Sequence, residues 1–205
     1  MGRTHCLTGA AVGAWTLPAV AAVADLPWSG QVAWVAAAAG FALAPDIDHP
    51  SSHAANMWGA PTRAVAKLTH GVFGHRGLTH HLLLAPAVFA GLVWAANMAP
   101  YGSAAMFGVA ACLAWSALDP VPDRRFTSGW NIAFAAFCGY IAHRYDVDLT
   151  LLPYAAAVGV IVHIVGDALT TRGVFGLFDT GSRPEHVIAW GASAATLIYP
   201  LTVLL

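Results

Sequence analysis

Charged residues are scarce in this chain, and their scarcity excludes an ordinary soluble domain. Asp, Glu, Lys and Arg make up 9% of the 205 residues, whereas hydrophobic residues make up 58%. Soluble domains carry roughly 25% charged residues, and a chain with far fewer cannot cover a globular surface with polar groups. Together with a mean hydropathy of +0.64, this composition predicts an integral membrane protein.

The chain also lacks a charge excess and a cysteine pattern. Its net charge is −1 with histidine neutral, so charge gives no argument for nucleic-acid binding, and we expect no nucleic-acid partner. Cys6, Cys112 and Cys138 are odd in number, scattered, and form no CxxC pair. We therefore expect small buried side chains at these positions rather than metal ligands or a disulfide.

What the chain does have is a series of apolar segments rich in alanine and glycine. Several are shorter than the ~20 residues of an ordinary spanning helix, and small pairs such as Gly9 and Gly13 favour close helix packing. The sequence predicts one all-α domain over residues 1–205, a polytopic membrane helix bundle. Its seven expected segments are 7–24, 31–45, 82–98, 102–118, 128–142, 152–168 and 187–204.

The positive charges predict an orientation for this bundle. If the N-terminus is cytoplasmic and every segment crosses, eight of the nine Lys and Arg residues lie on the cytoplasmic side and Arg144 lies alone on the other. This bias follows the positive-inside rule. We expect a bacterial inner-membrane protein with a cytoplasmic N-terminus, whose first segment is retained rather than cleaved as a signal peptide. The oligomeric state is not predicted.

Two polar connections differ in character. The longest, 46–81, contains an expected amphipathic helix near 62–73, with Val65 and Leu68 toward apolar surroundings and Arg63 and Lys67 toward water. The sequence HRYDVD at 143–148 falls on the opposite side of the membrane, and we interpret it as an exposed loop.

The first polar cluster is APDIDHPSSH at 44–53, where Asp46, Asp48, His49 and His53 follow an apolar segment. Carboxylate oxygens and imidazole nitrogens are ligands for zinc or manganese. A helix-ending turn explains one aspartate. It does not explain Asp-x-Asp-His at a membrane boundary, where ionisable groups are costly unless partnered, so the pattern favours a metal site.

The second cluster is GHRGLTHH at 74–81. His75 and His80 are the better candidate ligands, because the flanking glycines let the backbone turn tightly. Arg76 carries a planar cation suited to phosphate, and the Thr79 hydroxyl can orient a histidine or a ligand. The alternative is a basic, pH-sensitive surface loop. Further options as ligands are His70 and His81.

The third cluster is HIVGDALTTRG at 163–173, at the end of the sixth segment. His163 and Asp167 are four residues apart and share one face of a helix. They suit a metal site, or an aspartate that orients a metal-bound histidine; the alternative is a hydrogen-bonded pair that caps the bundle. In the seven-crossing topology these clusters and His5 all fall at one membrane face.

In combination the motifs resemble the YdjM family, described as LexA-regulated, membrane-bound, metal-dependent hydrolases. An early histidine, PDIDH at 45–49, HRGLTH at 75–80 and H-x3-D-x2-T-x2-G at 163–173 carry the resemblance. The segment GLFDTGSRPE at 176–185 departs from the family's apolar–proline ending. The family is itself similar to zinc-dependent phospholipase C and P1-type nuclease proteins, which bind metals through histidines and aspartates and cleave phosphodiesters.

The resemblance implies a site for one to three divalent ions, zinc or alternatively manganese. Asp48 is expected to accept a proton from the attacking water, Arg76 to bind a phosphate oxygen, and His80 to complete the catalytic set. The implied metal ligands are His5, Asp46, Asp48, His75, His80, His163 and Asp167. The implied supporting or substrate-binding residues are His49, Arg76, Thr79 and Thr170.

From these observations we expect a hydrolase that cleaves a phosphoester, with a membrane lipid as substrate, at the cytoplasmic interface. One alternative is a metal or proton transporter, which would need polar residues along the membrane depth. The other is a non-catalytic membrane protein whose metal site is structural.

Overall fold

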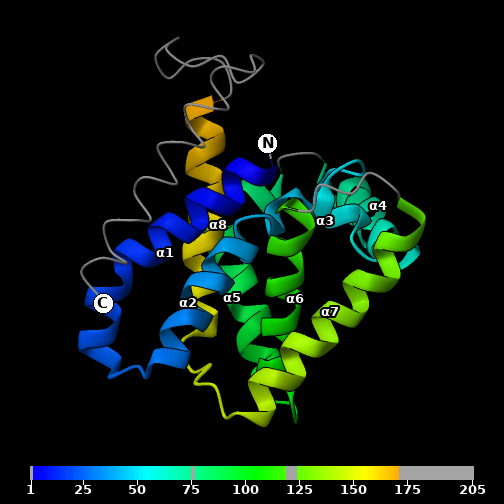
Figure 1. The fold of residues 1–205 in the computed structure, drawn as a ribbon. Coiled ribbons are helices and arrows are strands. Elements are labelled where there is room, and N and C mark those ends of the chain that lie inside the picture. Colours follow the sequence, from blue (N-terminus) through cyan, green and yellow to red (C-terminus); the bar gives the residue numbers. More distant parts are fainter. Residues whose placement is uncertain (1, 75–76, 119–123, 171–205) are drawn as a thin grey trace.

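The structure is a computed structural model that describes residues 2–74, 77–118 and 124–170, and within these ranges every regular element is a helix (Figure 1). The predicted all-α class is therefore confirmed for the described residues. The long helices are α1 (Gly2–Ala24), α2 (Trp28–Phe41), α5 (Leu84–Asn97), α6 (Gly102–Leu118), α7 (Arg124–Arg144) and α8 (Leu152–Thr170). The shorter ones are η1 (Ala44–Asp48), α3 (His53–Asn56), α4 (Ala60–Phe73) and η2 (Leu78–His80).

Successive long helices run in alternate directions. The start of α1, the end of α8 and all four short helices therefore gather at one end of the bundle, which we call the upper end as drawn in Figure 1. The connections α1–α2, α5–α6 and α7–α8 lie at the opposite, lower end. This arrangement brings together residues that are distant in the sequence, as the alternating topology predicts.

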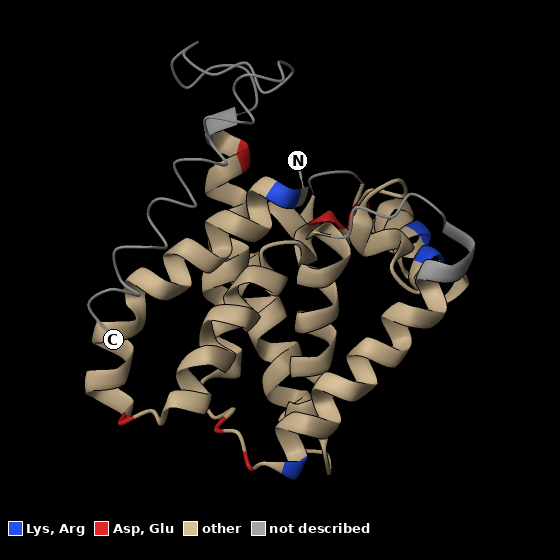
Figure 2. Ribbon diagram, in the orientation of Figure 1, with Lys and Arg blue, Asp and Glu red and all other residues tan. Residues whose placement is uncertain are grey.

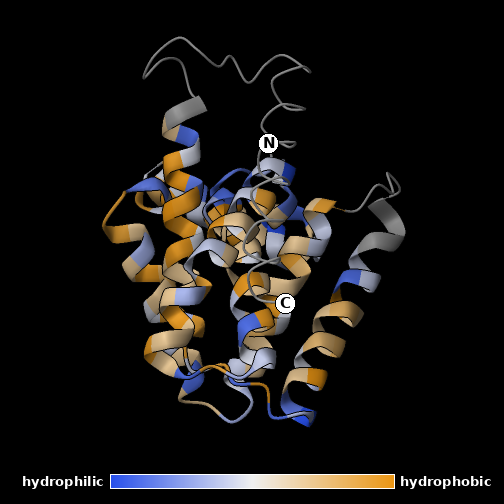
Figure 3. Ribbon diagram, turned by 60° about the vertical axis from the view of Figure 1, so that its left-hand side comes forward, coloured by the Kyte–Doolittle hydropathy of each residue, from blue (hydrophilic) through white to orange (hydrophobic). Residues whose placement is uncertain are grey.

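The apolar segments predicted within the described residues coincide with α1, α2, α5, α6, α7 and α8, and the seventh, 187–204, lies outside those residues. By length and hydropathy, 2 helical stretches suffice to cross a membrane, Gly2–Ala24 and Trp28–Asp48, and three shorter apolar helices accompany them. Crossing by all seven segments stays a prediction. Charged residues of the described chain lie at the two ends of the bundle (Figure 2), and hydrophobic residues dominate the helices between them (Figure 3).

Small residues let α2 lie at the centre of the bundle. A Cβ on Gly9 of α1 would be 2.7 Å from the Ala38 carbonyl oxygen, and a Cβ on Gly159 of α8 would be 2.6 Å from the same atom. On the other side, a Cβ on Gly40 would overlap the carbonyl group of Ala110 in α6. Side chains at these positions would push the helices apart. Glycine therefore allows α1, α6 and α8 to pack closely against α2.

Helix α4 confirms the predicted amphipathic helix. It begins with proline in its first turn, and its moderately polar sequence lies beside the upper end rather than inside the bundle. Val65 and Leu68 are 52% and 69% exposed, and Arg63 and Lys67 are also exposed. An apolar face left uncovered by protein is the expected property of a helix lying at a membrane interface.

The three cysteines are free thiols. Cys6 and Cys112 are buried, as expected, whereas Cys138 is half-buried.

Candidate metal centre

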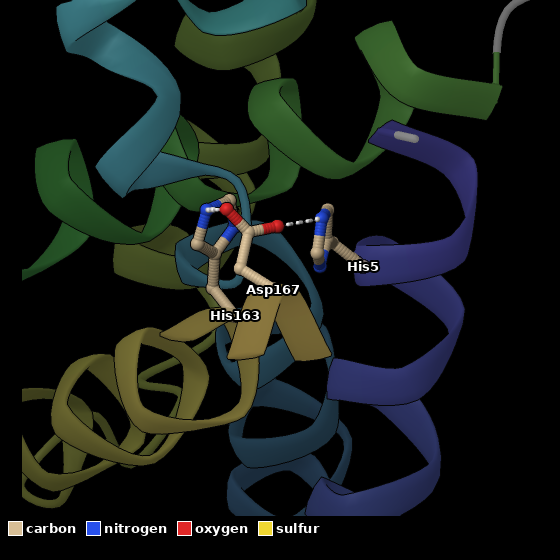
Figure 4. Close-up of side chains that lie close together, drawn as sticks. All are labelled: His5, His163 and Asp167. Carbon is tan, nitrogen blue, oxygen red and sulfur yellow. Dashed lines mark ion pairs between the residues drawn. The ribbon is translucent and has the colours of Figure 1, made fainter. Parts of the chain in front are cut away.

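Six of the seven predicted metal ligands converge at the upper end of the bundle. His5 comes from α1, Asp46 and Asp48 come from η1, His80 comes from η2, and His163 and Asp167 come from α8. Figure 4 shows His5, His163 and Asp167 pointing toward one another from their two helices. The seventh, His75, lies outside the described residues, as does Arg76.

His163 is the most deeply placed ring of the cluster. It is 0% exposed, and its Nδ1 lies 2.8 Å from the carbonyl oxygen of Ala42. A carbonyl can only accept, so Nδ1 carries the ring proton and donates it. The lone pair of the neutral ring is then on Nε2, which faces Asp46 at 3.8 Å and Asp167 at 4.0 Å. A backbone carbonyl that fixes the tautomer in this way is a usual second partner of a metal-binding histidine.

His5 lies beside this ring. The centroids of the His5 and His163 rings are 4.1 Å apart, and His5 Nε2 lies 3.2 Å from Asp167 Oδ1. Gly166 makes room for the contact, because a Cβ there would be 3.3 Å from His5 Nδ1. Asp167 thus presents one oxygen to α1 and the other to the centre of the cluster.

Asp48 holds His80 in place. Its side chain is fully buried, and its Oδ2 accepts a hydrogen bond from Thr79 Oγ1 at 2.6 Å and lies 3.3 Å from His80 Nδ1. His80 Nδ1 donating to this carboxylate would leave Nε2 toward the cluster, 3.6 Å from Asp167 Oδ2. This carboxylate–histidine arrangement orients metal ligands in many proteins. The contacts agree with the supporting role predicted for Thr79.

The nitrogens of two rings meet at the centre. His80 Nε2 and His163 Nε2 are 3.2 Å apart. If both Nδ1 atoms carry protons, two neutral rings would direct lone pairs at each other, which is unfavourable. The contact becomes favourable if His80 is doubly protonated, or if a cation sits between the nitrogens. The chemistry of this donor set therefore fits a divalent ion.

The donor atoms form two overlapping groups. One contains His5, His163 and Asp167, the other contains Asp46, His80 and His163, and within each group the donor atoms lie within 4.8 Å of one another. Zinc–ligand bonds of about 2.0–2.1 Å place tetrahedral ligands about 3.3–3.4 Å apart. The observed separations of 3.2 Å for His5–Asp167 and 3.2 Å for His80–His163 are close to that value. The two oxygens of Asp167 suit a carboxylate shared between two ions.

Other histidines that the sequence suggested have different surroundings. His81 is exposed and caps α5, because its Nδ1 accepts the backbone N–H groups of Leu83 and Leu84 at 3.3 and 3.2 Å. His49 is exposed, and its Nδ1 lies 2.9 Å from Ser51 Oγ. Neither ring belongs to the two donor groups.

The remaining candidates touch the cluster indirectly or cannot be placed. His70 is hydrogen-bonded through Nδ1 to the backbone carbonyl of Asp48, at 3.0 Å, so it supports η1. His53 is exposed at the start of α3. The side chain of Thr170 lies outside the described residues.

Sequence reasoning missed three contributors. Ser52 donates to the Asp46 carbonyl at 2.7 Å and accepts the Ala55 N–H at 3.0 Å, so it caps α3 and holds η1. Its signal was a serine directly before a short helical stretch, the usual position of an N-cap. Gly166 and the carbonyl of Ala42 gave no signal, since their roles depend on how α8 packs against α1 and α2.

Together, fold and site define a membrane protein whose described residues form a helical bundle with a buried histidine–aspartate centre at one end. The family model described as YdjM inner membrane protein matches residues 1–178, a range that includes every residue of the cluster. The chain therefore belongs to the YdjM inner membrane protein family, as its motifs suggested. No curated protein and no solved structure matches it.

Proposed function

We propose that the protein is a membrane-bound, metal-dependent hydrolase that cleaves a phosphoester of a lipid headgroup at the cytoplasmic membrane interface. The observation that carries this proposal is the convergence of three imidazoles and three carboxylates, from four separate parts of the chain, at one end of an apolar bundle. Burying so many ionisable groups is costly unless they partner one another or a cation.

The two donor groups would hold the ions, with zinc favoured by imidazole and carboxylate ligands. A bound divalent ion supplies a water of lowered pKa and polarises a phosphoryl oxygen. The chain's contribution is to fix the donors: Ala42 holds His163 by its Nδ1, and Asp48 with Thr79 holds His80. Preorganised donors of this kind lose no free energy to reorientation when the site is used.

Asp46 is a better candidate for the proton acceptor than Asp48. The Asp46 side chain is 25% exposed, whereas that of Asp48 is 0% exposed and already accepts from Thr79. A group that exchanges protons with an attacking water must be within reach of that water. Arg76, which the motif places four residues before His80, remains the proposed phosphate ligand because its planar cation matches phosphate oxygens.

A transport function has less support. A relay for ions or protons needs polar residues through the membrane depth, whereas the charged residues of the described helices lie at the two ends of the bundle (Figure 2). The main alternative to a hydrolase is a non-catalytic protein whose metal site is structural. An assay of hydrolytic activity distinguishes these two functions.

The decisive assay is headgroup release from a panel of phospholipids in mixed micelles by the zinc-loaded protein. We expect hydrolysis of at least one lipid, loss of hydrolysis on chelation, and recovery with zinc. The variant His143→Ala, which removes an exposed ring at the lower end of the bundle, is the matched control and should keep its activity. Full activity after metal removal would reject the mechanism, and inactivity of fully metal-loaded protein across the panel would favour a structural site.

A further inference from the structure

An apolar groove lies next to the metal centre, on the outside of the bundle. It is bounded by α4, α5 and α6 and closed at its upper end by η1 and η2, with a cavity volume of about 360 Å³. Its walls are hydrophobic side chains with two threonines, Thr69 and Thr79, among them. A cavity of this size and character is in the range that binds small apolar ligands.

The groove and the metal centre share Thr79. Thr79 lines the groove, and its hydroxyl group donates a hydrogen bond to Asp48 and lies 3.0 Å from His80 Nδ1. A ligand that fills the groove therefore ends beside the ring that the cluster uses. Ile47, which stands between Asp46 and Asp48 in η1, also lines the groove.

The groove continues from the centre toward the middle of the bundle. It follows α5 from Ala85 to Val93, which at 1.5 Å per residue is about 12 Å. One leaflet contributes about 15 Å of hydrocarbon. Its rim includes Val88 and Leu92, which are 40% and 58% exposed, so it opens where lipid would surround the helices.

Helix α4, at the upper end of the groove, has one largely apolar face and one cationic face. Val65, Thr69 and Phe73 line the groove and recur every four residues, so they share one face. Arg63 and Lys67, also four apart and exposed, form a cationic face. Cations at this level attract the phosphates of anionic headgroups.

We propose that the groove binds one acyl chain of a phospholipid and so presents the headgroup to the metal centre. This inference rests on the proposed function. It specifies the substrate as a phospholipid that binds through one of its acyl chains. A helix of a partner protein is a poorer occupant, because a helix 10–12 Å in diameter would occupy on the order of three times the cavity volume over the same length.

The test uses vesicles containing a phospholipid with a photoactivatable diazirine in one acyl chain. Labelling is mapped by peptide mass spectrometry on the full-length protein reconstituted in those vesicles without added metal. We expect label concentrated on α5 and α6 at the groove, and its reduction by excess unlabelled phospholipid. Even labelling of all lipid-facing helices, or no label in the groove because a second copy or another segment fills it, would overturn the inference.

A pair of substitutions sharpens the result. Val88→Trp should fill the groove and remove most of its label, whereas Val32→Trp, at a 47% exposed position of α2 outside the groove, should leave it unchanged. Helix content by circular dichroism checks that both variants fold, and the wild-type map stands even if one does not. Labelling needs no catalysis, so the two proposals can fail separately. A labelled groove in an inactive protein would reject the hydrolase function and support the acyl-chain site. Hydrolysis without groove labelling would support the hydrolase function and reject the acyl-chain site.

Discussion

The two ends of the bundle carry similar residues with opposite outcomes. At the lower end, His143, Asp146 and Asp148 line a cavity of about 1060 Å³, and His143 and Asp146 are exposed. His143 packs against Tyr101, with ring centroids 4.7 Å apart, and Asp148 accepts the N–H of Thr150 at 2.9 Å. The Asp148 contact is that of an ordinary turn. The segment HRYDVD is only partly the exposed loop that the sequence predicts, because His143 and Arg144 belong to the last turn of α7.

At the upper end, the histidines and aspartates of the metal centre are instead buried or half-buried and are joined over long distances in sequence. His163 and His80 are 83 residues apart in the chain yet have nitrogens in contact. The difference shows that histidine and aspartate content does not define a site. Burial and convergence of donor atoms do, because only there must the groups find partners other than water.

The largest expected difference between the ends is their accessibility from the two sides of the membrane. In a Cys138→Ala background, Ser51→Cys at the upper end should react with a membrane-impermeant maleimide only after the membrane is opened. Thr150→Cys at the lower end should react in intact spheroplasts, since the positive-inside bias predicts that the upper end is cytoplasmic. The reverse pattern would invert the proposed orientation, and labelling of both from outside would refute a membrane-spanning bundle.

The next largest effect is on bound metal. His163→Ala removes the nitrogen common to both donor groups, so purified protein should lose nearly all of its zinc as measured by elemental analysis. His143→Ala removes a histidine of the lower end and should retain wild-type zinc. Equal metal in all three proteins would show that the upper cluster does not bind it.

A smaller effect is expected where a carboxylate orients a ligand. Asp48→Asn keeps shape and hydrogen bonding to Thr79 but weakens the hold on His80, and loss of such outer partners costs about 10–100-fold in metal affinity. Competition with a fluorescent chelator measures the change. Asp148→Asn at the lower end should leave affinity unchanged; a loss of all metal in Asp48→Asn would instead indicate that Asp48 is itself a ligand.

The smallest effect concerns packing behind His5. Gly166→Ala places a Cβ 3.3 Å from His5 Nδ1, so the ring must shift by a few tenths of an ångström, and we expect a few-fold loss of zinc affinity. Gly91→Ala in α5 has nothing within 4 Å of the new Cβ and serves as the control. An unchanged affinity in Gly166→Ala would mean that His5 contributes little to binding.

Much of this organisation could be predicted from the sequence because the signals were local. Apolar stretches predicted the helices, and the spacing of four between His163 and Asp167 predicted their common face. Alternating helix direction then placed His5, η1, η2 and α8 at one end. The class, the family and the convergence of six candidate ligands all followed from such patterns.

The rest depended on three-dimensional packing. Nothing local shows that the Ala42 carbonyl fixes His163, that Gly166 admits His5, or that Asp48 faces His80 rather than open space. His81 and His80 are adjacent in the sequence, yet one caps α5 and the other enters the cluster. Neighbouring side chains point in different directions in a 3-10 turn. The backbone conformation at η2 therefore determines that His80 enters the cluster and His81 does not.

The central claim is that the upper cluster holds a divalent metal through imidazole and carboxylate groups. X-ray absorption spectroscopy of the zinc-loaded protein tests it most directly. We predict nitrogen and oxygen neighbours at about 2.0–2.1 Å with imidazole scattering, and loss of that signal in His163→Ala. A zinc shell containing sulfur, or a spectrum identical in wild type and His163→Ala, would contradict the account.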